Sequence, residues 1–250
     1  MGDNNMITKE LLLLAGKRKG LKNKEFIEKE YFQDLILSNI YSSSNFLVFK
    51  GGTALYKIYS LPRFSEDLDF SVLGDIEINE IEEVIETAAR KCKMKIKSKK
   101  EVKDSILFKL AFKGILTKYN TLRIDVNLKQ KVFEYDVKNY ISDFVDINPF
   151  SLKVLSLKEM IAEKIHSLLR RAKARDLFDL FFLLRLEKPE KEIMEKKLKI
   201  FGIKFNNELI KKKIKDIKPI WEKELRAFVL TELPEFNIVK NFVIENLSKV

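Results

Sequence analysis

The feature that most constrains the fold is an alternating acidic segment that follows a short apolar run and a double glycine. Residues 67–72 read Asp-Leu-Asp-Phe-Ser-Val, so polar and apolar side chains alternate with period two. This pattern predicts a strand with one acidic face and one apolar face. The apolar run at residues 46–49 is stopped by Gly51 and Gly52. We therefore expect a strand, a glycine turn and a short helix capped by Thr53.

The first 149 residues mix helical and strand patterns, whereas the remainder is mainly helical. The spacing of apolar side chains predicts two helices, at residues 24–38 and 76–90. Alternating patterns predict three further strands, at residues 94–102, 105–112 and 121–128. After Pro149 the strand patterns fade and helical spacing takes over. We expect an α/β fold, with a mixed sheet and flanking helices in residues 1–149, a helical domain in residues 150–250, and a basic cleft between them.

Cysteine and histidine usage limits the kinds of metal site that the chain can build. Cys92 and His166 are the only residues of their types, so an intrachain disulfide and a Cys/His zinc site are excluded. Any metal must therefore be held by oxygen ligands. No apolar stretch is long enough to span a membrane, and residues 11–15 are too short for a signal-peptide core. We expect a cytoplasmic protein without a membrane partner.

The charge balance favours a polyanionic partner. Lys and Arg outnumber Asp and Glu by 48 to 37, which gives a formal net charge of +11. A basic surface binds nucleic acid through its phosphates, so RNA is a candidate partner. A generally lysine-rich composition explains the same charge equally well.

Three aspartates form a candidate metal site. Asp67 and Asp69 lie two residues apart on the predicted acidic strand, so they point to the same side, where divalent cations would offset their repulsion. Asp125 lies in another predicted strand, on the side opposite its apolar neighbours. Three such carboxylates suit two Mg²⁺ or Mn²⁺ ions, one activating an attacking hydroxyl and one holding a triphosphate and its leaving pyrophosphate.

The glycine turn adds a candidate phosphate site. Gly51 and Gly52 carry no β-carbons and precede a predicted helix, whose N-terminus offers backbone N–H groups and a positive dipole end to a nucleotide. The Thr53 hydroxyl is a further candidate donor. Each element alone has an ordinary alternative, a plain tight turn or a surface strand with alternating acids. Because the glycine turn and the acidic strand follow each other closely in this order, together they are stronger evidence for a nucleotide site than either is alone.

Three short segments resemble the AbiEii-type nucleotidyltransferase toxins, which belong to the DNA polymerase β-like nucleotidyltransferase superfamily. The matching segments are Phe-Lys-Gly-Gly-Thr-Ala-Leu at residues 49–55, Arg-Phe-Ser-Glu-Asp-Leu-Asp-Phe at residues 63–70, and Ala-Glu-Lys-Ile with Arg-Asp-Leu-Phe-Asp-Leu at residues 162–165 and 175–180. Gly-Gly-Thr stands where the superfamily has a Gly-Ser pair, as is usual in the AbiEii-like branch. The resemblance runs from residue 46 to residue 184.

The resemblance implies an enzyme that moves a nucleoside monophosphate from an NTP to an acceptor hydroxyl. It also implies the toxin of a toxin–antitoxin pair, with a cognate antitoxin as partner and, as in some members, a tRNA 3′ end as acceptor. One alternative keeps the enzyme and changes the acceptor to a small molecule or a protein hydroxyl. Another is a non-catalytic nucleotide- or RNA-binding protein, which the intact set of Asp67, Asp69, Asp125 and Lys164 disfavours.

The later motifs add candidate nucleotide-binding residues. Lys164 and Arg171 are seven residues apart and share one face of a predicted helix. The resemblance implies that Lys164 neutralises the β- and γ-phosphates, and we expect Arg171 or Arg175 to steady the triphosphate or the acceptor RNA. By position alone, Lys164 also fits an ordinary surface lysine.

Two acids and two loop residues complete the set of candidates. The resemblance gives Asp176 a role at the nucleotide or in orienting Lys164. Asp179 has a structural explanation, as an acid near the start of a helix that begins close to residue 174. Arg63 and Ser65 precede the acidic strand and are candidate phosphate ligands, although loop structure explains them nearly as well.

Overall fold

The structure is a computed structural model that describes residues 7–249. By its internal contacts the chain divides into two compact units. Unit 1 comprises the described residues up to Ala54 together with Glu66–Lys129 and Val137–Val154, and unit 2 comprises Leu55–Ser65, Gln130–Asp136 and the residues from Leu155 onward. The units interleave in sequence because two short segments that precede residue 149 belong to unit 2. The last crossing falls between Val154 and Leu155, near the predicted boundary at residue 149.

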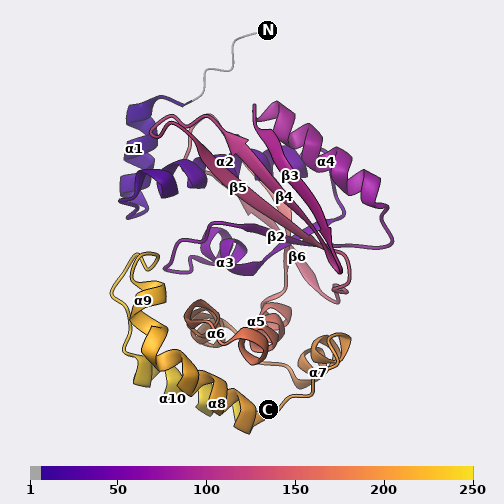
Figure 1. Ribbon diagram of the computed structural model, residues 1–250, viewed down its shortest axis with the longest axis vertical. Coiled ribbons are helices and arrows are strands. Elements are labelled where there is room, and N and C mark those ends of the chain that lie inside the picture. The colour runs from indigo at the N-terminus through magenta and orange to yellow at the C-terminus, as the bar shows by residue number, and fades with distance from the viewer. Residues whose placement is uncertain (1–6, 250) are drawn as a thin grey trace. The chain divides into compact units, whose positions relative to one another are not determined.

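Unit 1 contains a mixed sheet and three helices that lie wholly within it in the described part of the chain (Figure 1). The helices are α1 (Lys9–Arg18), α2 (Lys24–Tyr41) and α4 (Ile78–Lys91), and α3 (Gly51–Tyr59) passes from unit 1 into unit 2. The strands are β1 (Leu47–Lys50), β2 (Leu68–Val72), β3 (Lys95–Val102), β4 (Ser105–Phe112), β5 (Asn120–Asn127), β6 (Tyr135–Tyr140) and β7 (Phe150–Leu155).

The seven strands have the order β3-β4-β5-β2-β1-β7-β6. Strand β2 pairs antiparallel with β1 and parallel with β5, and β1 pairs parallel with β7, so the predicted mixed sheet is confirmed. The prediction that strands end at Pro149 is wrong, because β7 follows it directly. Strand β6 was also missed. It lies at the sheet edge with mostly exposed side chains, so it needs no apolar alternation.

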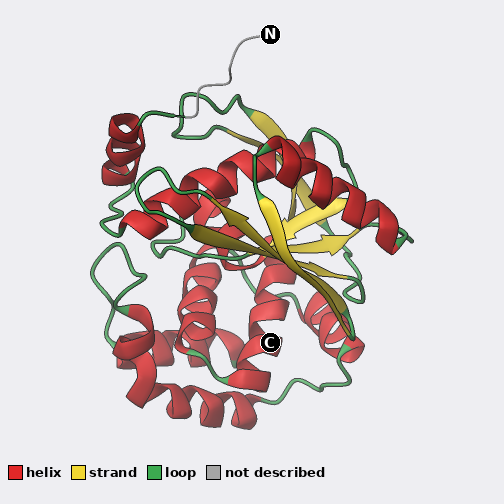
Figure 2. Cartoon of the chain, turned by 45° about the horizontal axis from the view of Figure 1, so that its top comes forward, coloured by secondary structure: helices red, strands yellow, loops and turns green. Residues whose placement is uncertain are grey.

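One face of the sheet carries the core of unit 1. Strand β4 places Ile106, Phe108 and Leu110 on this face, and all three are fully buried. Helices α2 and α4 cover it (Figures 1 and 2), and Phe32 of α2 stacks on Phe112 with ring centroids 3.9 Å apart. Each fully buried side chain of this size contributes about 1.5–3 kcal/mol to the free energy of folding. Because the apolar side chains of the strands are buried on this face, the acidic side chains that alternate with them point to the opposite face.

Helix α2 also fixes loops of unit 1 through buried acids. Asp34 is fully buried and accepts hydrogen bonds from Tyr140 Oη at 3.0 Å and Ser142 Oγ at 2.6 Å. Burial, and then the neighbouring Asp34 carboxylate, raise the pKa of Tyr140 far above its usual value. Glu28, also fully buried, accepts a hydrogen bond from the Thr117 backbone N–H at 3.0 Å. These bonds satisfy carboxylates that would otherwise destabilise the core.

Unit 2 is helical, as predicted for the second half of the chain. Its helices are α5 (Leu157–Arg171), α6 (Ala174–Leu186), α7 (Lys191–Ile200), α8 (Asn207–Ile217), α9 (Trp221–Leu225) and α10 (Phe236–Leu247), with a 3₁₀ turn at Lys218–Ile220. Ser156 begins α5 by accepting a hydrogen bond from the Glu159 backbone N–H. Helix α5 packs against both α6 and α7 (Figure 1). In residues 7–249 no helix has the length and hydropathy needed to cross a membrane.

Candidate active site

The register of neighbouring strands places two predicted metal ligands side by side. Asp69 of β2 pairs with Asp125 of β5, and on its other side it pairs with Lys50 of β1. Directly paired residues point to the same side of a sheet, so these three side chains form one row, which we call the acid row. The adjacent pair Leu68 and Ile124 is fully buried on the face that α2 and α4 cover. We call the opposite face, which carries Asp69 and Asp125, the acid face.

Thr53 holds the backbone just before the acidic strand. Its side chain is fully buried, and its hydroxyl donates a hydrogen bond to the Asp67 carbonyl oxygen. The predicted cap position is wrong, because α3 begins at Gly51 and Thr53 lies inside the first turn. Asp67 itself lies one residue before β2. In this structure the Thr53 hydroxyl therefore ties α3 to the Asp67 backbone, whereas the sequence suggested that it donates to phosphate.

Position 51 requires glycine for two reasons, its backbone conformation and the closeness of the Asp69 carboxylate. The φ of Gly51 is +76°, a left-handed value that costs other residues about 1–2 kcal/mol. A β-carbon built here would collide with the Asp69 carboxylate and lie 3.0 Å from its Cγ. Glycine thus lets the Asp69 carboxylate lie against the start of α3, where the helix N-terminus presents its backbone N–H groups.

Replacing Gly51 by Ala is expected to reduce activity far more than it reduces stability. The added methyl group must displace the Asp69 carboxylate, whereas the backbone strain alone costs about 1–2 kcal/mol. Gly74→Ala is the matched control, because Gly74 also has a φ of +76° and no atom lies within 4 Å of its built β-carbon. Urea unfolding and transfer rates should show similar stability losses in the two variants and an activity loss only for Gly51→Ala. Equal activities would contradict this role of Gly51.

The donor set fits an oxygen-binding cation such as Mg²⁺ or Mn²⁺. Within residues 7–249, no group of three or more His, Cys, Asp and Glu side chains is arranged to hold a metal, and the register joins only Asp69 and Asp125. A carboxylate pair can bind Mg²⁺ when phosphate oxygens and water supply the other ligands. Cys92 offers no alternative, since burial raises the pKa of its thiol to about 12 and Asn39 donates a hydrogen bond to its sulfur.

Unit 2 contains the later motif residues in a continuous chain of ion pairs. Arg63 donates two hydrogen bonds of 2.6 Å to the carboxylate of Asp179, and Lys164 Nζ lies 2.7 Å from the same carboxylate. Lys164 also lies 3.4 Å from Asp176, which accepts hydrogen bonds of 2.7 and 2.8 Å from Arg171. We call these five residues the charge chain. It links a loop of the first half of the sequence to α5 and α6.

Burial makes the charge chain electrostatically strong. The side chains of Asp176 and Asp179 are fully buried, and that of Lys164 is 12% exposed. Burial alone would raise the pKa of Asp179, but Arg63 and Lys164 outweigh it and lower that pKa. Burial is likewise outweighed at Asp176, where Lys164 and Arg171 lower the pKa to about 2. Lys164 remains charged because Asp179 and Asp176 outweigh its burial and raise its pKa.

Several of the predicted site residues make contacts with other side chains within the charge chain. Arg63 is buried with its guanidinium on Asp179, in contrast to the phosphate contact that the sequence suggested. Asp176 contacts Lys164, the residue that the sequence suggested it either orients or joins at the nucleotide. Arg175 is exposed and Ser65 is half-buried. The contact between Arg63 and Asp179 spans 116 residues and has no periodic signal in the sequence.

Two buried lysines were missed by the sequence reasoning. Lys50 is 6% exposed and adjoins Asp69 in the acid row, which only the pairing of β1 with β2 reveals. Lys197 of α7 is fully buried and pairs with Glu159 of α5 at 2.6 Å and with Glu163 at 3.2 Å. Lys197 also donates to the Lys131 carbonyl at 2.9 Å, so it attaches the segment Gln130–Asp136 to the helices of unit 2.

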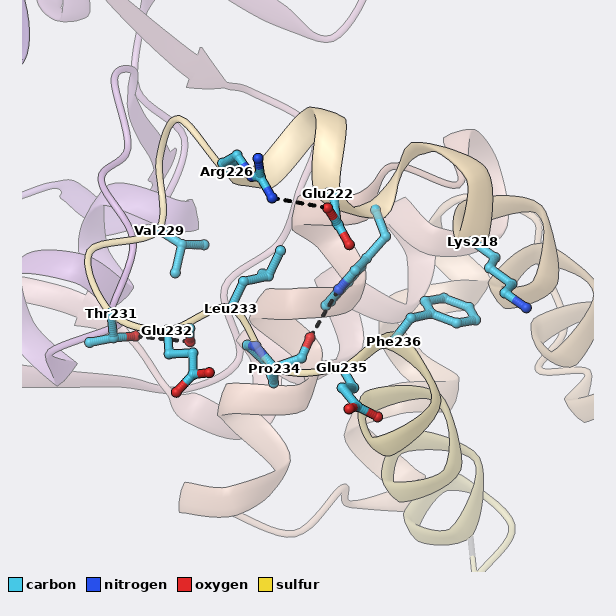
Figure 3. A pocket seen from close by; sticks show the side chains of 11 residues that line it. Lys218, Glu222, Arg226, Val229, Thr231, Glu232, Leu233, Pro234, Glu235 and Phe236 are labelled. Atoms are coloured by element: carbon cyan, nitrogen blue, oxygen red, sulfur yellow. Dashed lines mark hydrogen bonds and ion pairs between the residues drawn. The ribbon is translucent and has the colours of Figure 1, made fainter.

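A separate pocket of about 530 Å³ lies near the C-terminal end of unit 2 (Figure 3). Its wall includes Trp221, whose indole N–H donates to the Pro234 carbonyl at 3.0 Å, and Arg226, which lies 3.3 Å from Glu222. Glu232 and other acids also line it, so the pocket has no net basic character. This lining gives it no selectivity for a nucleotide.

A family model described as nucleotidyl transferase AbiEii toxin, type IV toxin–antitoxin system, matches residues 36–239. This match extends past residue 184, where the resemblance of the sequence motifs ends. No curated protein matches the chain.

Solved structures similar to this chain have low sequence identity but nearly full coverage. The nucleotidyltransferase toxin MenT4 from Mycobacterium tuberculosis is 19% identical with a TM-score of 0.68, covering 95% of this chain and 88% of its own. JHP933 from Helicobacter pylori is 21% identical with a TM-score of 0.54, covering 91% and 92%. A putative nucleotidyltransferase from the same species is 20% identical with a TM-score of 0.54, covering 91% and 95%. These likenesses establish the fold.

Proposed function

This chain belongs to the nucleotidyl transferase AbiEii toxin family of type IV toxin–antitoxin systems and is a nucleotidyltransferase; from that premise we propose that its acceptor is the 3′-terminal hydroxyl of an RNA, with tRNA as the first candidate. The enzyme would transfer a nucleoside monophosphate from an NTP and release pyrophosphate. The observation that carries this proposal is the pairing of Asp69 with Asp125 on one face of the sheet. Two adjacent carboxylates suit phosphoryl transfer, and both lie on the face of the sheet opposite the core of unit 1.

In this proposal different residues of unit 1 bind the nucleotide and the acceptor. Asp69 and Asp67 would hold a divalent cation that binds the triphosphate of the nucleotide, and Asp125 would face the acceptor hydroxyl. Mg²⁺ or Mn²⁺ bound there would offset the triphosphate charge and make the hydroxyl a better nucleophile. Gly51 and Gly52 present backbone N–H groups at the start of α3 to phosphate oxygens.

Unit 2 would contribute positive charge. Lys164 is the proposed partner of the triphosphate, and Asp176 and Asp179 fix its position and keep it protonated. The side chain of Arg171 is 47% exposed and Arg175 is exposed, and we propose both as contacts of the triphosphate or the RNA. Arg63 supports this arrangement indirectly by binding Asp179.

The net charge and the family support the rest of the proposal. A formal charge of +11 favours an RNA acceptor over a small neutral molecule. A type IV toxin has a cognate antitoxin, which we propose as the protein partner. NTPs and tRNA meet in the cytoplasm, and we propose that the enzyme acts there.

Incubation with each labelled NTP, Mg²⁺ and total tRNA tests the acceptor. We expect label on tRNA from one or more NTPs, because the acid row and the basic charge suit an RNA hydroxyl. A tRNA whose terminal nucleotide lacks the attacked hydroxyl should bind and remain unlabelled. Label on protein or on a small molecule, with tRNA unlabelled, would replace RNA by that acceptor class.

A further inference from the structure

The acid face carries more than the acid row. Arg123 lies two residues before Asp125 on β5, so both side chains point to this face. Arg123 pairs with Lys109 of β4, which therefore points the same way. Lys100 of β3 pairs with Leu107, which in turn pairs with Asp125. The register thus places three cations next to Asp125 across three strands.

An independent contact confirms which way strand β3 faces. Lys99 pairs with the fully buried Phe108, and its Nζ lies 2.7 Å from Glu82 of α4, so Lys99 points to the covered face. Lys100 is the next residue and points to the acid face. Two adjacent lysines of one strand therefore serve opposite faces of the sheet.

The three cations are available to a ligand. Arg123, Lys109 and Lys100 are all exposed, and none has an ion-pair partner among residues 7–249. Apart from Asp69 and Asp125, the paired positions of β2, β5, β4 and β3 place no carboxylate on this face. An uncompensated group of cations beside a carboxylate pair attracts a polyanion to that place.

We propose that Arg123, Lys109 and Lys100 form a basic track that binds the phosphates of the single-stranded 3′ end of the acceptor RNA and leads its terminal hydroxyl to Asp125. This inference rests on the proposed function and assigns the acceptor surface. Adjacent strands lie about 4.8 Å apart and alternate residues about 6.6 Å apart, so the track reaches about 10 Å from Asp125. This length suits the last few nucleotides of a strand.

The side chains of the track favour recognition of the sugar–phosphate backbone of the RNA. Lys and Arg bind phosphates without reading bases, so the track positions the RNA and leaves sequence choice to other groups. An acidic protein would suit the same charges. The RNA strand is favoured because the track ends at Asp125, the residue proposed to face the acceptor hydroxyl.

Matched triple variants test the track. One variant replaces Arg123, Lys109 and Lys100 by Ala. The control replaces Arg90, Lys91 and Lys99, which are also exposed and lie on or against α4 at the covered face. Each triple removes two lysines and one arginine. The readouts are the affinity of an end-labelled single-stranded oligoribonucleotide over a sodium chloride series, transfer to tRNA, and the thermal midpoint. The single variants Lys100→Ala and Lys99→Ala repeat the comparison with minimal disturbance.

The track variant is expected to bind RNA about tenfold or more weakly, with a salt slope flatter by about 2, because each single-strand phosphate contact contributes about 0.7 to the slope. The control should keep most of the affinity. Equal losses in both triples, or none in either, would overturn the track. If the parent binds RNA but labels none, the proposed acceptor fails, which the transfer readout shows separately from the track.

Discussion

Replacing Asp69 by Asn is expected to lower nucleotide transfer by roughly a thousandfold while the protein remains folded. Asp69 lies between Lys50 and Asp125 in the acid row, and its carboxylate lies against Gly51. Asparagine keeps the shape and removes the negative charge that a divalent cation needs. NTP binding in the presence of Mg²⁺ should weaken together with transfer.

Asp125→Asn should separate binding from transfer. Because Asp125 is proposed to face the acceptor, its loss should stop transfer and leave NTP binding largely intact. Asp75→Asn is the control, since Asp75 is an exposed carboxylate of unit 1 outside the acid row. Parent-like transfer by both Asp69→Asn and Asp125→Asn would remove the basis for a carboxylate-held cation.

Replacing Asp179 by Ala is expected to lower the free energy of unfolding by about 3–5 kcal/mol. The change leaves the guanidinium of Arg63, a residue that is only 3% exposed, without its carboxylate, and it removes one of the two partners of Lys164. Urea unfolding measures the loss. The exposed ion pair of Lys249 with Glu245 should contribute little to stability because solvent screens it, so Glu245→Ala serves as the control.

The double variant Arg63→Met with Asp179→Leu should recover part of that loss. Replacing both charged partners by apolar groups removes the unpaired buried charge, which is the main cost of the single change. Lys164 keeps its contact with Asp176 in this variant. A single Asp179→Ala variant as stable as the parent would show that the buried pair contributes little.

The local part of the site could be predicted from the sequence. The alternation at residues 67–72 and 121–128 gave the strands and showed which residues share a face, because period two is a property of every strand. The double glycine marked the junction between β1 and α3, although both glycines belong to the first turn of α3. That Asp69 and Asp125 are direct neighbours depends on the order and register of strands, which the pattern of one strand does not contain.

The remaining features depend on contacts between distant segments. Arg63 looked like a loop arginine, and only the fold brings it to Asp179. Asp179 itself fits the structural role expected for it, although its partners are Arg63 and Lys164. Lys197 seemed an ordinary lysine of an amphipathic helix, yet it is fully buried between α7 and α5 because Glu159 and Glu163 satisfy its charge. Such compensated charges leave no mark in hydrophobic periodicity.

A divalent cation and a nucleotide are proposed to bind at the acid row. Anomalous diffraction from a crystal grown with Mn²⁺ and a non-hydrolysable NTP analogue tests this proposal most directly. The account predicts a manganese peak in contact with the Asp69 and Asp125 carboxylates, with the triphosphate near the start of α3. A nucleotide and its manganese bound elsewhere, with the Asp69 and Asp125 carboxylates touching neither, would contradict it.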